Sequence, residues 1–378
     1  MKRMYVIQGS DSRKYLAVII IILVALISSA RNSSACTAFS INRGDSLVVV
    51  GKNYDWDVDD GLIIVNQRKV AKAAFGQASP ASWVSRYGSI TFNQYGREMP
   101  DGGINEAGLV VEVLWLHESA YPSGDKRGAI GNLQWIQYQL DNCSTIDQVI
   151  ASDTLIRIAP DFGINVQYFV CDSSGRSAVI EFLDGKMKSF AYDNLPVAAI
   201  TNDTYEQSID YIKKYDFFGG EMPLGDRHRS ARAYSREASL DRFAHAAQNV
   251  KEYDPVRSPD LIKYAFGALE ETRSGDRTQW SIVYDIPARK VYCRTSRATK
   301  LKTIDMKVFD FSCHAIVKIM DINSSKSGEV SNLFEDYSFE ANLDLIQSSV
   351  SKTGILRNIP AEVLIRLAGY PGKFTCSE

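Results

Sequence analysis

The sequence predicts a layered α+β fold in which β-sheets are stacked between helices. Strand-like segments fall into groups along the chain, and helix-like segments separate these groups. The 378 residues are 45% hydrophobic and 23% charged, which supplies a sizeable core and excludes a disordered or collagen-like protein. No internal repeat, low-complexity tract or Pro-rich linker divides the chain.

The first strand group is predicted from β-branched and aromatic runs. Residues 36–41 and 47–50 form a hairpin, because Asn42-Arg43-Gly44-Asp45 between them is typical of a turn. Further strands are expected over 62–65, 89–93 and 109–116. Two helices follow, over 129–140 from the near-helical spacing of its apolar residues and over 144–152 from its Ser-Thr start.

A second group of strands, further helices and a third group of strands follow in the second half of the chain. Strands are expected over 165–171, 177–182, 187–192 and 197–201, then helices over 206–214, 230–250 and 259–271, then a hairpin over 279–285 and 290–295. From about Ala315 the pattern loosens. We therefore predict a main domain over 36–314 and a C-terminal segment, 315–378, of uncertain structure that packs on the same domain.

Residues 1–35 have the pattern of a signal peptide. Basic residues precede an apolar run over 15–27, and Ser33 and Ala35 form a small-x-small site before Cys36. The run has 13 residues, whereas a bilayer span needs about 20. We expect cleavage between Ala35 and Cys36, a periplasmic or secreted mature protein, and no stable membrane anchor. Lipidation of Cys36 is an alternative, although Ser33 stands where lipoprotein signals have a leucine-like residue.

Charge and cysteine content exclude several function classes. Lys plus Arg total 43 and Asp plus Glu total 45, so no basic excess favours nucleic acid. The six cysteines contain no C-x-x-C pair, which argues against zinc or thioredoxin-like chemistry. Disulfides are possible in an exported chain but are not implied by the spacing. Cys171 and Cys293 lie in apolar runs and are predicted to be buried.

A mature N-terminal cysteine combines two catalytic groups in one residue. Its thiolate is a nucleophile, and its free α-amine titrates near pH 8 and can act as a base. Downstream, Gly51-Lys52-Asn53-Tyr54-Asp55-Trp56 offers a cation and a carboxylate at a strand end. Taken singly, Asp55 is better explained as a turn cap and Lys52 as a solvated charge.

Five motifs occur in order along the chain, namely Cys36-Thr37-Ala38-Phe39, Gly51 to Trp56, Asp101-Gly102-Gly103-Ile104-Asn105-Glu106-Ala107-Gly108-Leu109, Thr201-Asn202 and Ser239-Leu240-Asp241-Arg242-Phe243. Together they resemble the choloylglycine hydrolases, the N-terminal-nucleophile amidases that include bile salt hydrolases and penicillin V acylases. The resemblance covers most of the chain from Cys36 to about Thr295. The resemblance implies a four-layer αββα N-terminal-nucleophile hydrolase sandwich that cleaves linear carbon–nitrogen amide bonds through a cysteine thioester. It also implies a small-molecule acyl-amide substrate, no metal or other cofactor, and a homotetramer.

The same resemblance assigns roles to individual residues. Cys36 falls on the family's nucleophile, Asp55 on the aspartate that holds the α-amine, Asn202 on the oxyanion-hole asparagine, and Arg242 on the helix-borne arginine near the nucleophile. Lys52 replaces an arginine of the family, keeping the charge but losing the planar fork of donors. As ordinary explanations, Asn202 also begins a turn-forming sequon and Arg242 suits a helix surface.

Trp115 stands where bile salt hydrolases have an oxyanion-side asparagine. Its surroundings are similar to the exported penicillin V acylases of Gram-negative bacteria, which also cleave acyl-homoserine lactones and generally ignore bile salts. Trp115 and Trp56 would offer flat apolar walls for an aryl or alkyl acyl group. Penicillin V, N-acyl-homoserine lactones and conjugated bile salts are the expected substrates.

Other function classes remain open from the sequence. One is a catalytically impaired binding protein on the same fold, in which Lys52 and Trp115 have replaced family residues. Another is a Cys-His protease, which would need a histidine beside Cys36. The chain has four histidines, and none lies in a protease signature: His117, His228, His245 and His314.

Overall fold

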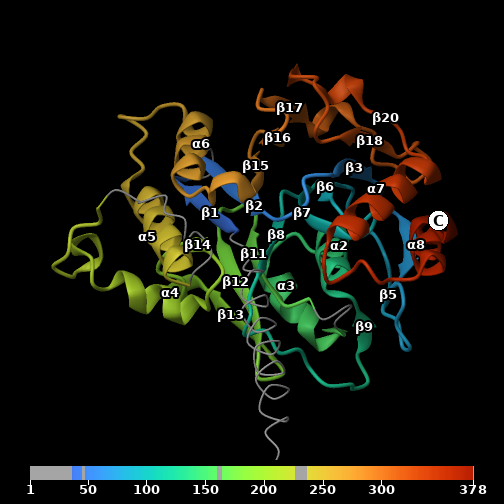
Figure 1. The fold of residues 1–378 in the computed structure, drawn as a ribbon, viewed down its shortest axis with the longest axis horizontal. Helices are drawn as coiled ribbons and strands as arrows, with labels where there is room; N and C mark the ends of the chain where they lie inside the picture. The colour runs from blue at the N-terminus through green and yellow to red at the C-terminus, as the bar shows by residue number, and fades with distance from the viewer. Residues whose placement is uncertain (1–35, 45–46, 160–163, 226–235, 378) are drawn as a thin grey trace, which may run out of the picture.

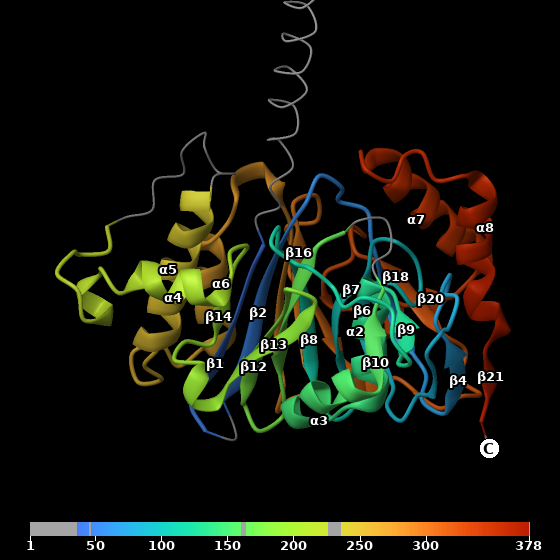
Figure 2. The same ribbon diagram turned by 90° about the horizontal axis from the view of Figure 1, so that it is seen from below.

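In a computed structural model, two large β-sheets stack face to face, with helices on both outer sides (Figures 1 and 2). The structure describes residues 36–44, 47–159, 164–225 and 236–377. The predicted signal peptide and the first six residues of the predicted helix 230–250 lie outside these ranges. The succession of helix, sheet, sheet and helix confirms the predicted αββα layering.

The first sheet has seven strands and carries the N-terminal hairpin. Its order is β14 (Ala199–Ile200), β1 (Thr37–Asn42), β2 (Val48–Asp55), β15 (Thr278–Asp285), β16 (Lys290–Thr295), β17 (Lys302–Asp305) and β19 (Gly328–Glu329). β1 and β2 are antiparallel with Ala38 opposite Lys52, so the predicted hairpin is confirmed. All eight residues of β2 are buried because one face packs on the second sheet and the other on helices. The strand predicted over 197–201 is reduced to two residues.

The second sheet has nine strands. Its order is β13 (Lys186–Ala191), β12 (Ser177–Leu183), β11 (Val166–Cys171), β8 (Val110–Trp115), β7 (Pro100–Asn105), β6 (Ser89–Asn93), β3 (Leu62–Asn66), β18 (Lys318–Asp321) and β20 (Glu335–Asp336). Sequence analysis missed β7, since Gly102 and Gly103 weaken the strand signal. Gly102 has a packing reason: a Cβ there would overlap the Glu112 carboxyl of the neighbouring β8.

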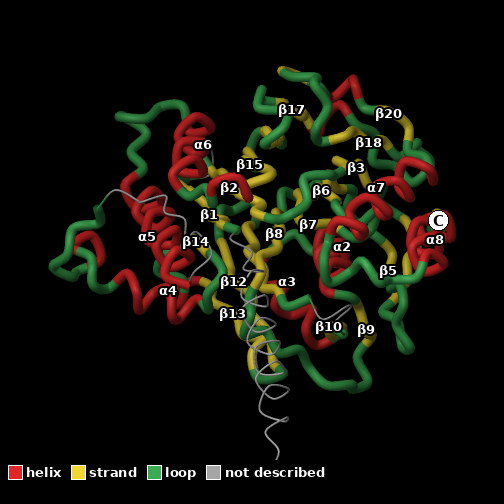
Figure 3. The backbone as a smooth tube through the Cα atoms, in the orientation of Figure 1, coloured by secondary structure: helices red, strands yellow, loops and turns green. Residues whose placement is uncertain are grey.

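Helices cover the two outer faces, as the grouping of red segments around yellow strands shows in Figure 3. The seven-stranded sheet is covered by α4 (Tyr205–Ile212), α5 (Arg236–Glu252) and α6 (Leu261–Glu271). The nine-stranded sheet is covered by α2 (Asn132–Asn142), with α3 (Ile146–Ala151) beside it. The helix predicted from residue 129 was wrong at its start. Residues there form β9 (Gly128–Ile130), paired with β10 (Ile156–Ile158), and α2 begins only after Gly131.

The C-terminal segment, residues 315–378, contributes strands to both large sheets. It supplies β18 and β20 to one sheet and β19 to the other, then α7 (Phe339–Lys352) and α8 (Ala361–Gly369), which lie beside each other. Its last strand, β21 (Thr375–Cys376), joins β4 (Val70–Ala73) and β5 (Ser82–Val84) in a small third sheet. A disulfide between Cys313 and Cys376 ties the end of the chain to the body.

The main apolar core lies between the two sheets and under α5 and α6. Cys171 and Cys293 are fully buried there as predicted, and burial raises the pKa of both thiols to about 12. Among the described residues, no helix has the length and apolar character that crossing a membrane would take.

Candidate active site

Strand pairing brings Cys36 and Asp55 together. Cys36 directly precedes β1 and Asp55 ends β2, and Thr37 lies opposite Asn53 in the antiparallel ladder. The Asp55 backbone N–H donates to Cys36 Sγ over 3.5 Å. Both residues are buried, with Cys36 only 3% exposed. The N-terminal end of the predicted mature chain is therefore held against the carboxyl end of the next strand.

Helix α5 positions Asn202 through two bonds. Asn202 follows β14, the strand beside β1. Its backbone N–H donates to Ser239 Oγ over 3.0 Å, and its side-chain Oδ1 accepts from Arg242 Nη2 over 3.1 Å. Ser239 and Arg242 are three residues apart, so they lie on the same face of the helix. The motif Ser239 to Phe243 thus fixes both the backbone and the amide of Asn202.

The bond to Arg242 also decides which way the Asn202 amide points. A guanidinium has only donors, so the atom facing Arg242 must be the amide oxygen and the NH₂ group must face the other way. Asn202 Nδ2 donates to the backbone carbonyl of Trp115 over 2.8 Å. That nitrogen has a second hydrogen, for which the described residues provide no acceptor. One N–H of Asn202 is therefore left for a ligand.

The backbone of Trp115 faces the same space. Leu116 N–H donates to Asn165 O, so the backbone groups of Leu116 point toward the β11 side. Neighbouring residues of a strand point their backbone groups in opposite directions, so those of Trp115 point away from β11. The Trp115 carbonyl on that side meets Asn202. β7 pairs with β8 only as far as Glu112, so that ladder does not use the Trp115 N–H.

Arg242 adds positive charge to this group. Its side chain is almost fully buried, and burial lowers its pKa, whereas the nearby Asp55 and Cys36 raise it. A guanidinium remains protonated in proteins even when buried. Arg242 therefore places a permanent cation near the Cys36 sulfur.

An aromatic pocket opens on Cys36. Trp56 and Trp115 line it, stacked at 29° with ring centroids 5.9 Å apart. Trp56 Nε1 donates to Tyr95 Oη over 2.8 Å, which fixes the indole in place. The pocket is narrow, about 40 Å³, and most of the remaining residues that line it are apolar. Such walls suit a flat aryl or slender alkyl group.

Lys52 does not line this pocket. It is fully buried between the two sheets, where Nζ donates to the Val113 carbonyl and lies 3.9 Å from Glu112 Oε2. Burial raises the pKa of Glu112 to about 7, and Lys52 acts to lower it. Since Val113 is two residues before Trp115, the lysine fastens β2 to the strand that carries the pocket wall.

Sequence reasoning missed several pocket residues. Tyr54 and Asp101 line it and bond to each other over 3.3 Å, and burial raises the pKa of Asp101 to about 7. Tyr54 and Asp101 lie within two of the five family motifs, and this position was the one sequence feature that pointed to them. Thr353, Ile355 and Leu356 come from the C-terminal segment, where no pattern marked them.

The histidines that a Cys-His protease would need can be compared with the pocket at Cys36, except for His228, which lies outside the described residues. His117, the nearest histidine candidate in sequence, is exposed, and its backbone carbonyl accepts from Asn165. The described residues that line the pocket include no histidine. The arrangement therefore gives no support to a Cys-His protease.

Comparison with known proteins matches this chain to one family and its structures. Residues 36–236 match the model of the linear amide C–N hydrolases, choloylglycine hydrolase family. A penicillin V acylase of Pectobacterium atrosepticum is 30% identical over 282 residues, which are 69% of this chain and 71% of the relative.

Two solved structures share the fold. The penicillin V acylase of Agrobacterium tumefaciens superposes with a TM-score of 0.67 at 25% identity, covering 80% of this chain and 98% of that one. A mutant of the conjugated bile acid hydrolase from Clostridium perfringens gives a TM-score of 0.60 at 17% identity, covering 77% of this chain and 98% of that one. The predicted N-terminal-nucleophile hydrolase sandwich is therefore confirmed.

Proposed function

The chain belongs to the choloylglycine hydrolase family of linear amide C–N hydrolases, and from this premise we propose that it cleaves acyl amides with Cys36 as an N-terminal nucleophile. The observation that carries the proposal is the convergence of Asp55, Asn202 and Arg242 around Cys36, which lines the aromatic pocket. Cys36 precedes β1, Asp55 ends β2, Asn202 follows β14 and Arg242 is in α5, so the four residues meet only in the folded chain.

The reaction begins at the sulfur. Cleavage after Ala35 exposes the α-amine of Cys36, which takes the thiol proton, and the sulfur attacks the amide carbonyl carbon. The tetrahedral intermediate collapses by breaking the C–N bond, and the amine leaves with a proton from the Cys36 ammonium. Water then attacks the thioester, which releases the acid and restores the thiol. Asp55 holds the α-amine in place during both proton transfers.

Two N–H groups are placed to stabilise the oxyanion. One is the remaining Asn202 Nδ2 hydrogen and the other is the backbone N–H of Trp115. Each such donor is typically worth about 3 kcal/mol of transition-state stabilisation. The buried Arg242 supports this hole by holding Asn202.

The substrate class follows from the pocket walls. Trp56 and Trp115 form a flat apolar slot beside Cys36, which suits the phenoxyacetyl group of penicillin V or the alkyl chain of an acyl-homoserine lactone. A conjugated bile salt presents a wider steroid to the same slot. We therefore rank penicillin V and acyl-homoserine lactones ahead of bile salts.

We further propose that the protein is exported and processed at Ala35–Cys36 to a periplasmic or secreted form without a membrane anchor. The leader pattern in residues 1–35 and the Cys313–Cys376 disulfide favour this, since disulfides persist in oxidising compartments.

Amine release tests the proposed activity. Purified protein would be given penicillin V, an acyl-homoserine lactone and a glycine-conjugated bile salt separately, and the freed amine would be quantified. Cys36→Ser should abolish release, whereas Cys171→Ser, at another fully buried thiol, should retain it. Release by Cys36→Ser at the rate of the unmodified protein would refute the nucleophile. No release from any substrate by the unmodified protein would favour the binding-protein alternative.

A further inference from the structure

A second cavity lies next to the active-site pocket, walled by the C-terminal helices. It has a volume of about 380 Å³, far larger than the pocket at Cys36. One side is formed by Met99 and Leu133, which is in α2, and the other by Val350 at the end of α7 and Val363 and Leu367 in α8. Neither the motifs nor the catalytic residues account for this space.

The cavity and the pocket adjoin each other. Four residues line both, namely Tyr95, Leu133, Ile164 and Leu356. At this junction Tyr95 Oη is bonded to Trp56 Nε1 over 2.8 Å and to Thr353 Oγ1 over 3.0 Å. The second cavity is therefore the nearest space beyond the tryptophans for a group that extends from Cys36.

The cavity lining is suited to hydrocarbon. Ten of its described lining residues are Phe, Met, Leu, Ile or Val, and only Arg366 among them is charged. Arg366 is exposed, and the other polar side chains of the lining are those of Asn132 and Tyr95. Space of this size holds at least several methylene groups, and mostly apolar walls retain water poorly.

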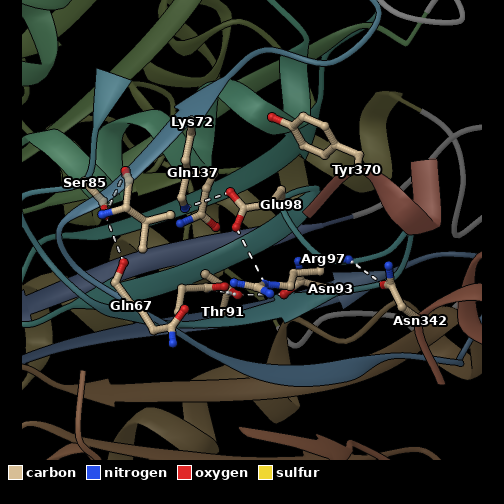
Figure 4. A network of polar contacts seen from close by, with 12 residues as sticks. Gln67, Lys72, Ser85, Thr91, Asn93, Arg97, Glu98, Gln137, Asn342 and Tyr370 are labelled. Carbon is tan, nitrogen blue, oxygen red and sulfur yellow. Dashed lines mark hydrogen bonds and ion pairs between the residues drawn. The ribbon is translucent and has the colours of Figure 1, made fainter. Parts of the chain in front are cut away.

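Buried polar contacts hold α7 and α8, the C-terminal wall of the cavity, in position. Asn342 in α7 is fully buried, accepts from the Arg97 backbone N–H over 2.8 Å, and donates to the Ala368 carbonyl of α8 over 3.1 Å. Tyr370 accepts from Gln134 Nε2 over 3.0 Å and donates to Ala73 O. Figure 4 shows the bond between Asn342 and the Arg97 backbone, with Tyr370 in the same region. The wall is a fixed part of the molecule.

We propose that this cavity is a second acyl-binding subsite, which takes the distal methylenes of a long, unbranched fatty acyl amide whose carbonyl lies at Cys36. The inference rests on the proposed function for the position of the carbonyl. The narrow pocket takes the first carbons, and the C-terminal segment then selects for chain length. Each methylene that enters should raise kcat/KM about fourfold, from the roughly 0.8 kcal/mol gained when a CH₂ group leaves water.

Two substitutions on α8 separate filling of the cavity from a change elsewhere on the same helix. Val363 lines the cavity and is half-buried, so Val363→Trp fills the space. Ile365 is 48% exposed and does not line the cavity, so Ile365→Trp is the matched control. With butanoylglycine and dodecanoylglycine as substrates, Val363→Trp should lower kcat/KM at least tenfold for dodecanoyl and leave butanoyl within twofold. Ile365→Trp should change neither.

Binding to the Cys36→Ser protein keeps the inference independent of turnover. By calorimetry, dodecanoylglycine should bind at least tenfold more tightly than butanoylglycine, and Val363→Trp should remove the difference. Equal affinities for the two chain lengths would overturn the subsite, whatever the activity. Tight, length-dependent binding without hydrolysis by the unmodified protein would instead keep the subsite and refute the amidase function.

Discussion

Asn202→Asp isolates the oxyanion donor from the structural role of the same side chain. Aspartate has the same shape and keeps an oxygen for Arg242 Nη2, now as a buried ion pair in place of the present 3.1 Å hydrogen bond. It replaces the NH₂ group that faces Trp115 with a second oxygen. The variant therefore loses both Nδ2 hydrogens and places negative charge where the oxyanion develops.

The size of the effect follows from these contacts. Loss of one oxyanion donor costs about 2.7–4 kcal/mol, or about 10²–10³ in kcat, and charge repulsion adds to this. We expect kcat for penicillin V to fall at least about 10³-fold with the fold intact by circular dichroism. Ser239→Ala removes only the bond to the Asn202 backbone and its contact with Thr201, worth about 1 kcal/mol, and should cost less than about tenfold. If Asn202→Asp retains kcat within tenfold of the unmodified protein, Asn202 is not the oxyanion donor.

Three further predictions concern buried charge and the disulfide. Because the pKa of Glu112 is raised to about 7 from 4.5, the folded protein holds a proton that the unfolded chain releases, and this stability is lost as pH rises from about 4.5 to 7. Urea unfolding should show that the free energy of unfolding falls between pH 5 and pH 8 by roughly 3 kcal/mol less in Glu112→Gln than in the unmodified protein. An equal fall in the two proteins would contradict this prediction. Lys52→Met removes the cation that lowers the pKa of the pocket residue Asp101, so it should shift the pH–rate profile of kcat/KM to higher pH, whereas an unshifted profile would show that Lys52 has no role in the chemistry. Replacing Cys313 and Cys376 by serine should lower the free energy of unfolding by about 4 kcal/mol, since the bond closes a loop with a sequence separation of 63, and a loss under 1 kcal/mol would show that the loop is ordered without it.

The sheets were predictable where strands are buried on both faces. The β-branched run over 47–50 and the turn before it define the first hairpin, and the structure has the same pair. β7 was missed because Gly102 leaves room for a neighbouring carboxyl, which is a tertiary requirement that no local pattern shows. The helix predicted over 129–140 lost its first residues to β9, which forms only because β10, more than twenty residues later, pairs with it.

The candidate site was predictable from family motifs and from little else. Asp55, Asn202 and Arg242 are individually ordinary residues, and only their order along the chain marked them. The geometry adds what sequence lacks, namely that Arg242 sets the direction of the Asn202 amide. It also shows that Lys52 is buried between the two sheets and does not line the pocket. The C-terminal wall had no signal because its apolar positions face a cavity and not a continuous core.

The most direct measurement of the central proposal is an intact mass of the protein, expressed with residues 1–35 and acid-quenched during turnover of penicillin V. The account predicts a chain that begins at Cys36 and carries one phenoxyacetyl group, which maps to Cys36 on peptide analysis and is absent from Cys36→Ser. A chain that still carries the leader, a diacylglycerol mass on Cys36, or an acyl group on another residue would contradict it.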